Sequence, residues 1–324
     1  MTEFFRYLGF FALLIASTSL FADTAKINAF TDKMVTEHGF ERAEVTRILE
    51  QARKRQDIID KISRPAERTM NWGQYRKIFL TDKRTVQGVD FWRRNEQALK
   101  DAQQKYGVPP RIVVAIIGIE TFYGRITGRD KVLDALYTLG FYYPKRSKFF
   151  LGELESYLLL TREEQMDPTK PKGSYAGAMG LGQFMPSSYL SYAVDFDGDG
   201  KRDIWHNETD AIGSVANYFS RHGWSEGKPV TRQVKGVEQR HQSFVKAGMK
   251  PSISIAELRS AGIDTGKGLP DKMLSSLIEL ETSAGKEYWL GLPNFYTITR
   301  YNHSNMYAMA AYQLSERILL KKNK

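Results

Sequence analysis

One carboxylate stands in the most apolar stretch of the chain. Residues 109–124, PPRIVVAIIGIETFYG, are apolar on nearly all sides of a helical projection, which predicts a buried helix. Pro109 and Pro110 favour the helix start, because a first-turn residue has no intrahelical use for its N–H. Gly124 favours the helix end, where a left-handed cap suits glycine. Glu120 is the only acidic residue between these limits.

The surroundings of Glu120 suit a general acid. Apolar neighbours disfavour a charged carboxylate, and the negative end of the helix dipole lies close by. Both effects favour the protonated carboxyl, the form that can donate a proton near neutral pH. The alternative is a glutamate at a helix end that reaches water or pairs with Arg125 or Arg129. This stretch alone leaves the two interpretations open.

A second stretch whose residue types could form a functional site is residues 174–189, SYAGAMGLGQFMPSSY. Their closely spaced glycines indicate backbone that approaches another group closely or adopts positive φ angles. Gln183 places an amide donor and acceptor among apolar residues, a composition typical of a cleft wall. Pro186 favours the start of another helix. The alternative is a tight packing loop without a ligand.

Together the two stretches resemble the lytic murein transglycosylase B family, the membrane-bound or soluble B type of lytic transglycosylase. The shared pattern is a buried helix ending E-T-x-x-G, followed by G-A-M-G-L-G-Q-F-M-P-S. The resemblance continues in residues 210–224 and 291–304 and covers nearly the whole mature chain. It implies a mainly α (α+β) fold with a lysozyme-like core, a helical N-terminal part and a small β-rich insertion.

The resemblance also implies an activity and its residues. Members of the family cut peptidoglycan between N-acetylmuramic acid and N-acetylglucosamine, at the β-1,4 bond, and leave 1,6-anhydromuramic acid ends. Glu120 matches the single catalytic acid/base, and no cofactor is implied for catalysis. We assign Asp130 and Asp134, which follow closely, to the start of the next helix. The substrate-binding positions that the resemblance implies are Ser174 and Gln183 near the carboxyl and sugar, and Tyr301 and Asn302 lining the cleft.

Two other functions fit the same residues. A muramidase of lysozyme type would use water as the nucleophile and create ordinary reducing ends. A non-catalytic peptidoglycan-binding protein would bind the wall and release nothing. The products released from purified sacculi separate all three.

An acidic motif, DFDGDGKRD at residues 195–203, predicts a calcium site. Oxygen ligands at alternate positions with a glycine at the turn match the first half of an EF-hand-like loop. His206 stands where an EF-hand has its bidentate glutamate, and the family resemblance implies Asp210 as the closing ligand of a loop spanning 195–210. The alternative is an acidic solvated turn. The expected ligands of a structural Ca²⁺ are Asp195, Asp197, Asp199, the Lys201 carbonyl and Asp210.

The N-terminus and the bulk composition indicate where the protein works. An apolar run over residues 7–21 follows Arg6 and precedes Ala22, which predicts a signal peptide over residues 1–22. The alternative is that this segment is not cleaved and remains as a membrane anchor. Export excludes nucleic acid as a partner, so the net charge of +10 indicates another acidic polymer. Peptidoglycan strands are such a polymer, because their peptides are rich in carboxylates. The chain has no cysteine for a disulfide or a lipid anchor, so we expect a soluble periplasmic protein.

Hydrophobic periodicity divides the mature chain into three parts. Residues 23–228 form the helical N-terminal part and the catalytic core, with one long amphipathic helix expected over 86–106. Residues 229–301 form the β-rich insertion, with extended runs expected at 275–281 and 295–301. Residues 302–324 form a C-terminal helix that returns to the core. We expect a monomer, and cell-wall synthases are candidate partners.

Overall fold

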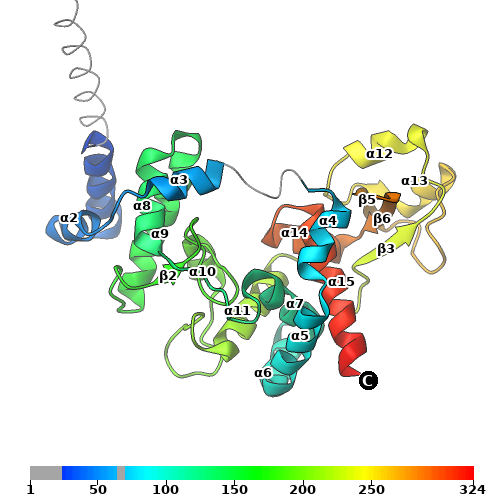
Figure 1. Ribbon diagram of the computed structural model, residues 1–324, viewed down its shortest axis with the longest axis horizontal. Coiled ribbons are helices and arrows are strands. Elements are labelled where there is room, and N and C mark those ends of the chain that lie inside the picture. Colours follow the sequence, from blue (N-terminus) through cyan, green and yellow to red (C-terminus); the bar gives the residue numbers. More distant parts are fainter. Residues whose placement is uncertain (1–23, 64–69) are drawn as a thin grey trace, which may run out of the picture. The chain divides into compact units, whose positions relative to one another are not determined.

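The structure, a computed structural model, describes residues 24–63 and 70–324 as two compact units (Figure 1). The first unit comprises residues 24–63, 128–179 and 184–191, and the second comprises 70–127, 180–183 and 192–324. Across these described ranges, no helix combines the length and the apolar character needed to cross a bilayer. The expected signal peptide, residues 1–22, lies outside the described residues.

The first unit is helical with one short two-stranded sheet. Helix α8 packs along α9, and α3 packs against α8. The edge of the Phe30 ring meets Phe141 with centroids 5.9 Å apart, which joins the N-terminal helix to α8. The elements are the helix over residues 24–38, α2 (Arg42–Glu50), α3 (Gln56–Ser63), β1 (Asp130–Lys131), α8 (Val132–Tyr142), η2 (Pro144–Arg146), α9 (Ser147–Glu163), β2 (Lys172–Gly173) and α10 (Pro186–Tyr192), whose last residue belongs to the second unit.

The second unit is built around α7 (Pro110–Thr121). Helices α5, α6, α11 and α15 all pack against it, which explains why α7 is apolar on every side. Its apolar side chains from Ile112 to Ile119 are between 0 and 7% exposed. The prediction of a buried helix that begins at Pro110 is confirmed. The helices that pack against α7 are α5 (Asp82–Arg94), α6 (Glu96–Tyr106), α11 (Glu208–Arg221) and α15 (Asn305–Lys322), and α4 (Trp72–Phe79) and α14 (Pro293–Tyr301) pack against α15.

Helix α7 ends earlier than its glycine suggests. Phe122 already has left-handed backbone angles, with φ 52°, and Tyr123 and Gly124 follow at 60° and 83°. Side-chain contacts hold this unusual backbone. The Tyr123 ring covers Gly118, where an added Cβ would lie 2.6 Å from the ring, and its hydroxyl donates to the Arg84 carbonyl at 2.8 Å. The expected glycine cap is therefore the third of three left-handed residues.

A small antiparallel sheet forms the β-rich part of the second unit (Figure 1). Its strand order is β3-β6-β5-β4, and β5 and β6 form a hairpin in which Thr282 pairs with Gly285. One face covers its own apolar cluster, which includes Leu258, Leu277 and Leu290. The elements are β3 (Thr231–Val234), η3 (Gln239–His241), α12 (Gln242–Lys246), β4 (Ile253–Ser254), α13 (Ile255–Ser260), β5 (Leu274–Thr282) and β6 (Gly285–Gly291).

Two expected elements are different in the structure. The prediction of an extended run at 295–301 is wrong, because this stretch forms most of α14. Pro293 occupies its first turn, and Phe295 and Ile298, three residues apart, are both fully buried. The single helix expected over 86–106 is broken at Asn95, whose side chain donates to the Phe91 carbonyl at 3.0 Å and separates α5 from α6.

Candidate active site

Glu120 lies in the last turn of α7 and is partly buried. Its Oε1 accepts a hydrogen bond from the Tyr307 hydroxyl at 2.5 Å, across 187 residues of sequence. Tyr307 stands in the first turn of α15 and is only 2% exposed. Burial raises the pKa of Tyr307 well above its ordinary value, and the negative charge of Glu120 raises it further. Tyr307 therefore keeps its proton and serves as a fixed donor to the carboxylate.

Tyr301 is the second buried phenol on this side of α7. Its ring stacks on Phe219 with centroids 5.5 Å apart, and its hydroxyl donates to the Gly182 carbonyl at 2.5 Å. Burial raises the pKa of Tyr301 well above its ordinary value, with a further contribution from the charge of Glu120. Tyr301 thus ties the end of α14 to the loop 180–183 in the neighbourhood of Glu120.

The loop 180–183 is held against the end of α7 by polar contacts. The Thr121 hydroxyl donates to the Leu181 carbonyl at 2.9 Å. Gln183, with φ 51°, donates through Nε2 to the carbonyls of Thr127 at 3.1 Å and Gly180 at 3.0 Å. Its amide N–H groups therefore fix the loop. Gly180 has φ 68°, and a Cβ there would lie 2.5 Å from the Ile204 carbonyl oxygen, so the close approach expected of the glycines occurs here.

The other two expected substrate-binding residues, Ser174 and Asn302, belong to different units of the structure. Ser174 belongs to the first unit, where its hydroxyl accepts the backbone N–H of Ala178 at 3.0 Å. Asn302 directly follows Tyr301 as the C-cap of α14. Within the second unit, then, the structure gathers Glu120 and Tyr301 with the loop that carries Gln183. Tyr307 is the residue that sequence reasoning missed, although it stands three residues beyond the last matching stretch, 291–304.

The two carboxylates after α7 have structural partners in the first unit. Asp134 is in the first turn of α8, as expected, and is 4% exposed. Its Oδ1 accepts the backbone N–H of Arg53 at 3.0 Å. Asp130 lies just before that helix, in β1, and pairs with the Arg55 guanidinium at 3.3 Å. Both side chains thus join the segment 53–55 to the start of α8.

The acidic loop brings three of its expected ligands together. Asp195, Asp197 and Asp210 each offer a carboxylate oxygen, and these oxygens lie within 4.8 Å of one another. Backbone N–H groups shape the loop: Asp195 accepts from Gly200 at 2.8 Å and Asp210 accepts from Asp203 at 2.8 Å. Asp210 is fully buried, and this burial raises its pKa. Three clustered carboxylates favour a divalent cation bound by oxygen ligands.

Asp199 lies outside that group of three. It is exposed, and its Oδ1 accepts the backbone N–H of Lys201 at 2.9 Å, a hydrogen bond local to the turn. Asn207 instead reaches into the loop, and its Nδ2 donates to Asp197 at 2.7 Å. That hydrogen bond lowers the pKa of Asp197. The carboxylates that the structure brings together as potential metal ligands are therefore those of Asp195, Asp197 and Asp210.

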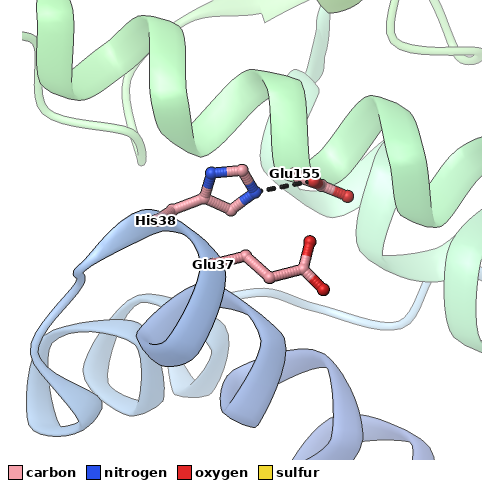
Figure 2. Close-up of side chains that lie close together, drawn as sticks. All are labelled: Glu37, His38 and Glu155. Atoms are coloured by element: carbon pink, nitrogen blue, oxygen red, sulfur yellow. Dashed lines mark hydrogen bonds and ion pairs between the residues drawn. The ribbon is translucent and has the colours of Figure 1, made fainter.

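A second group of potential metal ligands lies in the first unit (Figure 2). Glu37 and His38 stand at the end of the N-terminal helix, and His38 Nε2 is 2.7 Å from Glu155 on α9. The Lys33 ammonium is 2.6 Å from the other oxygen of Glu155 and 3.8 Å from Glu37. Because Lys33 already supplies a positive charge, we interpret this group as an ion-pair network that joins the N-terminal helix to α9.

Comparison with known proteins agrees with this fold. Residues 22–316 match the family model described as the transglycosylase SLT domain. The chain therefore belongs to the lytic transglycosylases of that family and is an enzyme. It is 47% identical over 309 residues to the membrane-bound lytic murein transglycosylase B of Escherichia coli K12, an alignment that covers 93% of this chain and 84% of the relative.

The chain is also similar to three solved structures of lytic transglycosylases. The soluble lytic transglycosylase SltB1 of Pseudomonas aeruginosa has 48% identity and a TM-score of 0.87, over 92% of this chain and 100% of that one. The calcium complex of E. coli Slt35 has 47% identity and a TM-score of 0.83, over 92% and 94%. P. aeruginosa SltB3 with NAG-NAM-pentapeptide has 30% identity and a TM-score of 0.79, over 92% and 79%. The expected fold class and family are confirmed.

Proposed function

We propose that this lytic transglycosylase cleaves the β-1,4 bond between N-acetylmuramic acid and N-acetylglucosamine, with Glu120 as its single acid/base. The observation that carries the proposal is the placement of Glu120 at the end of the buried α7, held by the Tyr307 hydroxyl. A rigid helix and a fixed hydrogen bond restrict the carboxyl group to one position. General acid–base catalysis requires such positioning within hydrogen-bond reach of the transferred proton.

One carboxyl group can serve both halves of the reaction. Protonated Glu120 donates its proton to the bridging oxygen, so the N-acetylglucosamine leaves with a hydroxyl group. The resulting carboxylate then accepts the proton of the muramic 6-hydroxyl as that oxygen bonds to the anomeric carbon. The product is a 1,6-anhydro sugar, and Glu120 is protonated again. Most glycosidases need a second carboxylate to act as nucleophile or to activate water, and an internal nucleophile removes that requirement.

The substitution Glu120→Gln tests the assignment. Glutamine keeps the size of the side chain and an oxygen that can accept the Tyr307 hydrogen bond, but it cannot transfer a proton. We expect turnover to fall at least about 10²-fold while binding to sacculi remains. Mass spectrometry of the products released by the wild type should show 1,6-anhydromuropeptides. Ordinary reducing ends would instead identify a muramidase, and binding without release would identify a wall-binding protein.

We also propose that the loop 195–210 binds a structural Ca²⁺. Asp195, Asp197 and the buried Asp210 would hold the ion through carboxylate oxygens, with the Lys201 carbonyl and Asp199 as further candidate ligands. The similarity to Slt35, which was solved in complex with calcium, supports this proposal. The loop connects α10 to α11, and α11 packs on α7. An ion there would therefore stabilise the fold, with no direct part in the chemistry.

The proposed substrate lies outside the cytoplasm, so we propose export of the enzyme to the periplasm as a soluble protein. The apolar run at residues 7–21 supports this proposal, and the 324 residues contain no cysteine to which a lipid could be attached. The intact mass of the natively produced protein should correspond to a chain that starts near Asp23. A product that retains Met1 and fractionates with cytoplasmic markers would contradict export.

A further inference from the structure

Three basic side chains surround the ring of Phe122, two residues after Glu120. The Arg84 guanidinium carbon is 4.8 Å from the ring centroid, Lys83 Nζ is 5.9 Å away, and the Arg125 guanidinium carbon is 6.0 Å away. These distances are those of cation–π contacts. All four residues belong to the second unit, and we refer to them together as the Phe122 cluster.

The positive charges of the Phe122 cluster have no acidic partner among the residues that the structure describes. Arg84 is half-buried, and its guanidinium donates to the Gly118 carbonyl at 3.1 Å and to the Ile78 carbonyl. Lys83 and Arg125 are exposed, and neither forms an ion pair with a described carboxylate, the adjacent Asp82 included. The cluster therefore presents uncompensated positive charge at the end of the helix that carries Glu120.

Two other arginines of the same unit, by contrast, are paired with carboxylates. Arg94 binds Glu208 at 2.8 Å, and Arg111 binds Glu316 at 3.0 Å. Three unpaired cations on one ring are costly to bring together, because like charges repel. Such a group is suited to an anion from outside, and guanidinium groups favour carboxylates because their geometries match.

We propose that the Phe122 cluster binds a carboxylate of the peptide attached to the muramic acid that is being cleaved. This inference rests on the proposed function, which places that sugar at Glu120. Ile126, which directly follows Arg125, is 68% exposed and offers apolar surface for a peptide side chain. The cluster is thus a specificity site for the peptide and takes no part in the proton transfer.

The peptide is long enough to reach the cluster. Only Thr121 lies between Glu120 and Phe122, so the Cα atoms of these two residues are at most about 7 Å apart. An extended peptide of four to five residues spans roughly 13–17 Å. A peptide joined to the sugar at Glu120 can therefore place a carboxylate against Lys83 and Arg125 without any rearrangement of α7.

The test compares one variant on two substrates. Lys83→Gln/Arg125→Gln removes both exposed charges and leaves the half-buried Arg84 in place, so the fold should persist. The matched control, Arg93→Gln/Lys100→Gln, removes the same charge from exposed positions, and Arg93 lies about 15 Å further along α5 than Lys83. The substrates are soluble glycan chains that carry their peptides and the same chains stripped by an amidase.

The measured quantity is the ratio of kcat/KM on peptide-bearing chains to kcat/KM on stripped chains. We expect this ratio to fall about tenfold in the Lys83/Arg125 variant, mainly through KM, and to stay at the wild-type value in the control. Added salt should reduce the wild-type ratio, because exposed charges are screened. A ratio equal to that of the wild type would overturn the inference. So would an equal fall in the control, which would indicate only a general effect of net charge.

The outcome also separates this inference from the proposed function. If the cluster does not bind the peptide, the wild type still releases anhydro products from both substrates. If the enzyme is not a transglycosylase, the wild type yields no anhydro product from either substrate, and the inference fails with the function on which it rests.

Discussion

Replacement of Tyr307 by phenylalanine should reveal what the buried hydroxyl contributes to Glu120. The change deletes one oxygen from a side chain that is 2% exposed, so packing is nearly conserved. It removes the 2.5 Å hydrogen bond to Glu120 Oε1. Hydrogen bonds to charged groups contribute about 1.5–3 kcal/mol. If the bond orients the carboxyl group in the transition state, kcat should fall about 10- to 150-fold with little change in KM.

Tyr123→Phe is the matched control for this variant. Tyr123 is 5% exposed in the same unit, but its hydroxyl donates to the Arg84 carbonyl. In urea titrations the free energy of unfolding should fall by about 1.5–3 kcal/mol in Tyr307→Phe, whose hydroxyl binds a carboxylate, and by about 0.5–1.5 kcal/mol in Tyr123→Phe, whose hydroxyl binds a neutral carbonyl. Only Tyr307→Phe should lose turnover on soluble peptidoglycan chains. If the kcat of Tyr307→Phe equals that of the wild type, or if Tyr123→Phe loses as much, the hydroxyl has no positioning role.

Further perturbations probe the loop, the central helix and the ion-pair network. A chelator should lower the melting temperature of the wild type, and Asp197→Ala should abolish that difference; identical melting with chelator and with calcium would show that the loop is only a turn. Gly118→Ala places a methyl group 2.6 Å from the Tyr123 ring and should cost about 2 kcal/mol net, measured by the urea midpoint; an unchanged midpoint would contradict this packing. Burial raises the pKa of Glu155, but hydrogen bonds from its lysine and histidine partners outweigh burial and lower it. The ion pairs of Glu155 therefore stabilise the fold above the unfolded-state pKa of about 4.3, and this stabilisation is lost as the pH falls through the lower pKa of the folded state. Glu155→Gln should make the free energy of unfolding less sensitive to acid. If the variant and the wild type show the same dependence of stability on pH, the ion pairs do not contribute in this way.

Local sequence signals were sufficient where one element determines the feature. The start of α7 at Pro110 and its complete burial followed from a proline and an apolar run, and both are confirmed. The start of α10 at Pro186 was predicted for the same reason. In each case the backbone constraint acts within one turn, so no knowledge of the rest of the chain is required.

Local signals failed where distant contacts decide the conformation. The stretch 295–301 has the composition of a strand but forms α14, because Phe295 and Ile298 are buried together on one helix face. The end of α7 was placed at its glycine, whereas Phe122 and Tyr123 are already left-handed. The contact that accompanies this backbone comes from α5, since the Tyr123 hydroxyl bonds to Arg84. A propensity scale assigns neither residue to that conformation, and only tertiary contacts compensate for the strain.

Glu120 and Tyr307 show why a candidate catalytic residue is easier to find in a sequence than the residue that holds it in place. Glu120 is conspicuous because a carboxyl group is unusual in an apolar helix, and that signal is contained in twelve residues of α7. Tyr307 is one of 17 tyrosines, and nothing in its own segment distinguishes it. Its role depends on α15 packing against α7 at the end of the chain, which brings its hydroxyl to Glu120. The sequence therefore indicates the candidate acid/base through its contrast with an apolar helix and through the family resemblance, whereas the hydrogen bond that holds its carboxyl group depends on the fold of the second unit.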